Sequence, residues 1–186
     1  WRAALSGKEL EGDVTWEPQG SGKLVARMKT LAIPATASGA SQAASRELQP
    51  QTEPGDLPEL DVIAERFINK DTLLGRLEFV AVPISRDWRL DWLLLTNPES
   101  TLTLDGVWQL GLSRPTTRIN VRLETSDIGK LLTRLGQPQG VQRGTAKLEG
   151  SLSWNGPPYE LDYPTMTGNL ALEAAKGQFV KLDPGI

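Results

Sequence analysis

The chain has 186 residues, a formal net charge of −3, and neither cysteine nor histidine. The absence of these two side chains excludes thiol catalysis, histidine-based acid–base chemistry, serine triads that use histidine and nearly all zinc sites. The 20 lysine and arginine residues are scattered rather than clustered, so we expect no nucleic-acid partner.

Three regions follow one another along the chain. Residues 1–34 are predicted to form N-terminal strands of a sheet, residues 35–58 a low-complexity loop or insertion, and residues 59–186 the main β-sheet segment. The middle region is rich in Ala, Ser, Gln, Thr, Pro and Glu, and it buries too little apolar surface to offset the entropy lost on ordering. No apolar run approaches the ~20 residues that a membrane helix needs. Because the chain begins at Trp1, we expect a segment of a longer protein, with any membrane anchor outside it.

Alternation of apolar and polar residues predicts the strands of the main segment. Trp88, Leu90 and Trp92 share one predicted face, and Leu94 continues it. Comparable rows contain Leu102, Leu104 and Trp108; Ile119, Val121 and Leu123; and Leu148, Leu152 and Trp154. We therefore predict a mainly β fold, an extended and curled antiparallel sheet with an apolar concave face.

One short helix is predicted near residues 126–135. Ser126 is a suitable N-cap, and Asp127 is favourable in the first turn. Ile128, Leu131, Leu132 and Leu135 follow at helical spacing and form one apolar stripe, and Gly136 is a plausible stop. A helix of this length can cover one end of a sheet but not all of it.

A short phrase recurs in the sequence. Residues 10–16 and residues 148–154 both read Leu-Glu-Gly, any residue, an aliphatic residue, a hydroxyl residue and Trp. Each copy places a glycine in the middle of a predicted strand, on its apolar face. Glycine at such a position often marks a bulge, a bend or the close approach of another backbone.

The order of motifs from Leu60 onward resembles the YhdP branch of the AsmA-like envelope proteins of Gram-negative bacteria, near their C-terminal region. The segments that carry this resemblance are residues 60–67, 74–78, 88–90, 106–108, 117–121, 127–132, 148–150 and 177–179.

The resemblance implies a bridge-like lipid transport protein, located in the periplasm and anchored in the inner membrane through a segment outside this chain. It also implies a groove that carries phospholipid acyl chains between the inner and outer membranes, no catalytic residues and no cofactor. Expected partners are acyl chains, further segments of the same larger chain and other envelope proteins. The lipid-facing candidates are then Trp88, Leu90, Trp92, Leu94, Leu102, Leu104, Trp108, Ile119, Val121, Leu123, Leu148, Leu152 and Trp154.

Other interpretations remain open from the residues alone. The apolar rows are also consistent with an ordinary core, as in a purely structural envelope scaffold. The six tryptophans are compatible with a glycan-binding β module, although the predicted same-face neighbours of Trp88, Trp92, Trp108 and Trp154 are mostly Leu and Gly, which favours lipid or core over sugar. Catalysis by paired carboxylates is disfavoured, because the acidic residues fall at solvent-facing positions or strand ends.

Overall fold

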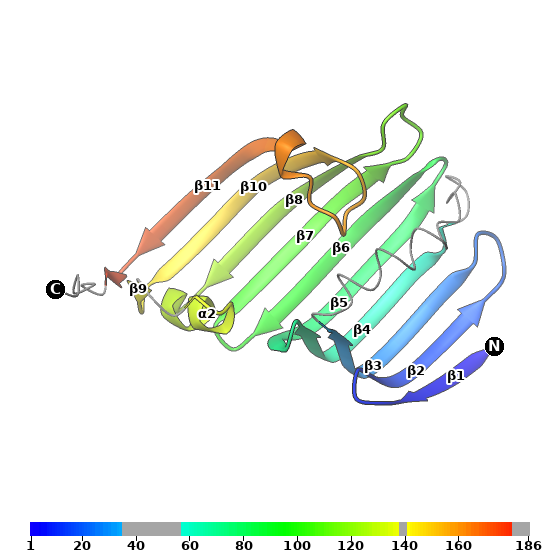
Figure 1. The fold of residues 1–186 in the computed structure, drawn as a ribbon, viewed down its shortest axis with the longest axis horizontal. Helices are drawn as coiled ribbons and strands as arrows, with labels where there is room; N and C mark the ends of the chain where they lie inside the picture. The colour runs from blue at the N-terminus through cyan, green and yellow to red at the C-terminus, as the bar shows by residue number, and fades with distance from the viewer. Residues whose placement is uncertain (35–56, 138–140, 180–186) are drawn as a thin grey trace.

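The computed structural model describes residues 1–34, 57–137 and 141–179, and within these ranges ten strands form one open, curved sheet (Figure 1). The strands, in spatial order, are β1 (Arg2–Ser6), β2 (Leu10–Glu17), β3 (Lys23–Ile33), β4 (Glu59–Asn69), β5 (Thr72–Ile84), β6 (Asp87–Asn97), β7 (Ser100–Gln109), β8 (Thr116–Thr125), β10 (Thr145–Asn155) and β11 (Thr167–Ala175). A separate two-stranded ladder joins β9 (Val141–Gln142) to β12 (Gln178–Phe179). The mainly β prediction is confirmed.

One junction departs from the predicted antiparallel pattern. All neighbouring strands of the large sheet are antiparallel except β3 and β4, which run parallel with Ala26 opposite Val62. Parallel neighbours require a long crossover, because the chain must return from one end of the sheet to the other. The prediction of a low-complexity loop over residues 35–58 falls almost wholly outside the described residues. The topology nevertheless shows that this stretch connects two central strands, so β1–β3 and β4–β11 belong to one mixed sheet.

Two rows of apolar residues cross the whole sheet perpendicular to the strands. Residues directly opposite one another in a ladder share a face, so the registers assign both rows to one side, which we call the apolar face. The first row is Ala3, Val14, Ala26, Val62, Phe79, Leu93, Leu104, Val121, Gly150 and Leu170. The second row is Leu5, Gly12, Met28, Ala64, Leu77, Leu95, Leu102, Leu123, Leu148 and Leu172.

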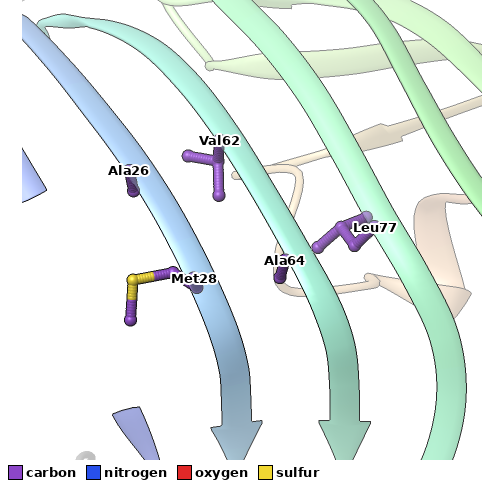
Figure 2. Packing of buried hydrophobic residues seen from close by; sticks show 5 residues of the cluster. All are labelled: Ala26, Met28, Val62, Ala64 and Leu77. Atoms are coloured by element: carbon purple, nitrogen blue, oxygen red, sulfur yellow. The ribbon is translucent and has the colours of Figure 1, made fainter. Parts of the chain in front are cut away.

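The most buried part of the apolar face lies on β3, β4 and β5. Figure 2 shows Ala26, Met28, Val62, Ala64 and Leu77 on one side of these strands, the inner side of their bend. Their side chains are almost completely shielded, and Ala64 has no exposed surface. Leu93 and Leu95 on β6 pack against this cluster, so the dry region extends toward the middle of the sheet.

The two copies of the repeated phrase place their glycines where neighbouring strands approach closely. A methyl group on Gly150 would collide with the backbone of Asn169 on β11. A methyl group on Gly12 would collide with the backbone of Arg27 and Met28, beside a β-bulge between Glu11 and Gly12. The prediction of bulges or close backbone approach at these glycines is therefore confirmed.

The predicted helix is present but shorter than expected. Helix α2 spans Ile128–Arg134, and its N-cap is Asp127 rather than Ser126. The Asp127 side chain accepts a hydrogen bond from the Lys130 backbone N–H at 3.0 Å, whereas the Ser126 hydroxyl donates to the carbonyl oxygen of Glu99. Arg134 ties the helix to the end of the sheet, because its guanidinium donates to the Glu99 carboxylate and to the Leu73 carbonyl oxygen.

Candidate functional site

Most of the sequence-predicted site residues do share one face. The register places the following on the apolar face: Trp88, Leu90, Leu102, Leu104, Trp108, Ile119, Val121, Leu123, Leu148, Leu152 and Trp154. Leu104 and Val121 occupy the centre of the first row, with Leu93 on one side and Gly150 on the other. The central positions are half-buried, and exposure rises toward the edge, where Leu172 on β11 is 68% exposed.

Trp92 and Leu94 lie on the opposite face, so the predicted row Trp88–Leu94 is wrong beyond Leu90. In β6 the register pairs Leu90 with Gly106 and then Leu93 with Leu104. Two residues, Asp91 and Trp92, therefore face one residue of β7, as in a β-bulge. The extra residue reverses the alternation, and Leu93 and Leu95 take the apolar positions that strict alternation assigned to Trp92 and Leu94.

A connection between β10 and β11 crosses the apolar face; we call this connection, residues 156–166, the strap (Figure 1). It contains a short 3-10 helix, η1 (Tyr163–Thr165). The Gly156 N–H donates to the Pro115 carbonyl oxygen at 2.8 Å, and the Thr117 hydroxyl donates to the Gly156 carbonyl oxygen at 2.7 Å. These bonds fix the start of the strap to the beginning of β8.

Trp154 packs between the sheet and the strap and forms a hydrogen bond with the strap. Its ring is 2% exposed, and its indole N–H donates to the Pro157 carbonyl oxygen at 3.1 Å. A tryptophan this well covered is part of the internal packing. Of the predicted lipid-facing residues, Trp154 is thus the one that the structure assigns to holding the strap rather than to an open surface.

An apolar pocket of about 290 Å³ lies between the strap and the sheet. Its walls include Leu60, Phe79, Trp88, Leu90, Leu93, Trp108 and Ile119 from the sheet, and Pro158 and Tyr159 from the strap. The Tyr159 ring meets the Trp108 ring edge to face, with centroids 6.3 Å apart. Strand alternation did not predict Leu93 as a residue of the apolar face, because the bulge that places it there was not recognised. No pattern in the sequence of the strap predicted Tyr159 as a residue of the pocket.

Charged residues collect on the other side of the sheet, which we call the polar face. A row of directly opposed residues there contains Thr103, Arg122 and Glu149. The Arg122 guanidinium lies 3.2 Å from the Glu149 carboxylate. A hydrogen bond from Lys147, reinforced by Arg122, holds the pKa of the Glu149 carboxyl below its usual range. The ion pairs of this region therefore lie on the polar face, which also carries the apolar side chains Trp92 and Leu94.

Within residues 1–34, 57–137 and 141–179, no group of three or more Asp or Glu side chains is placed to hold a metal ion. In the same ranges, no helix has both the length and the apolar character needed to cross a membrane.

These features define a class of protein, the single curved β-sheet with one continuous apolar face. The family described as YhdP protein matches residues 1–186, and the chain belongs to that family. The resemblance seen in the sequence is thus confirmed, and it points to an AsmA-like envelope protein with a role in lipid transport. Searches among curated proteins and among solved structures gave no match.

Proposed function

We propose that the apolar face between β5 and β10 carries phospholipid acyl chains, as one segment of a bridge-like carrier that connects the inner and outer membranes. The longer protein would lie in the periplasm and be anchored in the inner membrane through a segment outside this chain. The observation that supports this proposal best is the pair of unbroken apolar rows, which cross all ten strands without a charged residue.

The physics of such a surface suits transport. Each methylene group of an acyl chain that is buried against the apolar rows contributes about 0.8 kcal/mol to binding, at any position along the rows. The hydrophobic effect has no direction, so an acyl chain can advance along equivalent positions without breaking specific bonds. A site built for tight binding of one ligand would instead hold a few convergent polar groups.

The two edge strands of the sheet are suited to pairing with further strands. Strands β1 and β11 are the two outermost strands, and an edge strand presents unpaired backbone N–H and C=O groups to a further strand. Leu170 and Leu172 on β11 are 52% and 68% exposed, so both apolar rows reach the edge uncovered. Further segments of the same larger chain are the partners we propose for these edges.

Site-specific photo-crosslinking in the full-length protein tests the proposal. A benzophenone amino acid at Leu104 or Val121 is expected to form adducts with phospholipid. The adjacent positions Thr103 and Asn120 serve as matched controls, because they are exposed on the polar face of the same strands. Equal labelling of both faces, or no lipid adduct at either apolar position in folded protein, would refute the lipid path.

A further inference from the structure

The polar face carries a depression that the proposed lipid path does not use. This polar-face trough has a volume of about 930 Å³, and it crosses β6, β7, β8, β10 and β11. Neighbouring strands are spaced by about 4.8 Å, so five strands give a trough roughly 19 Å long. The residues that characterise it are Arg89, Asp91, Trp92, Asp105, Arg118 and Asn120.

Trp92 is a large aromatic side chain on the face that carries the ion pairs. It is 39% exposed, although a tryptophan gains more than any other side chain from being covered. The bulge in β6 is what turns it onto this face, and bulges commonly redirect a side chain next to a binding site. Val80, which is opposite Trp92 on β5, gives the ring an apolar neighbour. The result is a partly exposed indole ring at one end of the trough, which we call the aromatic platform.

Beside Trp92 and Val107, the trough contains polar side chains that offer both hydrogen-bond donors and acceptors. The Asn120 amide donates to one oxygen of the Asp105 carboxylate at 2.7 Å. The second oxygen of the Asp105 carboxylate and the side-chain carbonyl oxygen of Asn120 can therefore still accept hydrogen bonds from a ligand. Arg89 forms an ion pair with Asp91, whereas no ion pair of Arg118 occurs among the described residues.

The charge of the trough selects among ligand classes. Two arginines and two aspartates line it, so their formal charges cancel. A polyanion such as single-stranded nucleic acid also stacks on aromatic rings, but it requires a clearly positive groove. A neutral, hydroxyl-rich ligand matches an aromatic platform flanked by carboxylate, amide and guanidinium groups without any excess charge.

We propose that the polar-face trough binds an oligosaccharide. One sugar ring stacks on the Trp92 indole, and hydroxyl groups of the following rings donate to Asp105 and accept from Arg118. This site is independent of the lipid path, because it lies on the other face of the same strands. The carrier would thereby hold a glycan on one side of its sheet while lipid moves along the other.

Saturation-transfer NMR on the full-length protein tests the site with three defined probes: chitotriose, cellotriose and maltotriose. We expect at least one probe to bind, and Trp92→Ala to weaken that binding by about tenfold. Asp105→Ala is expected to weaken it as well. The matched control is Tyr163→Ala, which removes a 73% exposed aromatic ring from the strap and is expected to leave binding unchanged.

The proposal is overturned if none of the three sugars binds, if Trp92→Ala binds as the wild type does, or if Tyr163→Ala loses as much affinity as Trp92→Ala. Circular dichroism identifies any variant that fails to fold, and Trp92→Phe then provides a milder change that retains part of the stacking surface. Leu123→Glu separates the two functions, because Leu123 lies on the apolar face and does not line the trough, so sugar binding is expected to stay at the wild-type level.

Discussion

Replacing Trp154 distinguishes a structural role for this residue from a lipid-facing one. The side chain is 2% exposed, so Trp154→Ala opens a cavity beneath the strap. Loss of a buried tryptophan costs about 3–5 kcal/mol. The indole hydrogen bond to Pro157 is lost as well, which adds about 1 kcal/mol. A total near 4–6 kcal/mol is a large part of the 5–15 kcal/mol that stabilises a typical domain.

Urea denaturation measures this loss, and limited proteolysis reports whether the strap at residues 156–166 has opened. Trp154→Phe is the intermediate case, because it retains an aromatic ring but removes the N–H donor, and a loss of about 1–2 kcal/mol is expected. Trp92→Ala is the control on the opposite face, with an expected change within about 1 kcal/mol. If the two alanine variants lose the same stability, the assignment of Trp154 as the support of the strap is wrong.

Three further predictions concern separate parts of the sheet. Gly150→Ala is expected to lower the free energy of unfolding by about 1–3 kcal/mol, because the added methyl group meets the β11 backbone; an unchanged urea midpoint would contradict the close approach. The Arg134 hydrogen bond holds the pKa of Glu99 below its ordinary value of 4.5, so the stabilisation is present above that pH and is lost as the pH falls through the lower folded value. Glu99→Gln should therefore cost about 1.5–3 kcal/mol at neutral pH and progressively less in acid, which urea titrations at several pH values will detect; a difference that does not change with pH would count against this reasoning. Leu104→Glu should leave the protein folded and lower the free energy of unfolding by about 1–2 kcal/mol, whereas Leu77→Glu in the buried cluster should abolish soluble expression. Thermal melting and the yield of soluble protein measure the two effects. Equal destabilisation by both substitutions would show that both positions belong to the core.

Local alternation predicted much of the fold, and the reason is visible in β7 and β8. Leu102, Leu104, Val121 and Leu123 alternate with exposed polar residues at every step, because each strand has one wet and one dry face. Because side chains alternate between the two faces of a strand, this pattern assigns each of these residues to one face of the sheet. The helix was equally accessible, since its apolar stripe and its terminal Gly136 are local signals.

Features that depend on two strands at once could not be predicted. The β6 bulge is invisible in the β6 sequence, because Asp91-Trp92 reads as ordinary alternation until its partner Asp105 is known. The parallel β3–β4 ladder depends on a choice of neighbour that neither strand encodes in its own pattern. Burial of Trp154 likewise results from the strap, whose sequence carries no periodic signal.

The parallel junction between β3 and β4 has a consequence for the order of folding. From β4 to β8, each strand pairs with the next strand in the sequence across a short turn, whereas β8 pairs with β10 across residues 126–144. The β3–β4 ladder instead joins residues separated by the whole stretch 34–58, and the entropy of closing that loop is lost before the ladder returns any stability. Long-range pairing of this kind slows folding. We therefore expect the hairpins from β4 to β8 to assemble early and the β1–β3 block to join them later, although ribosomal synthesis delivers that block first.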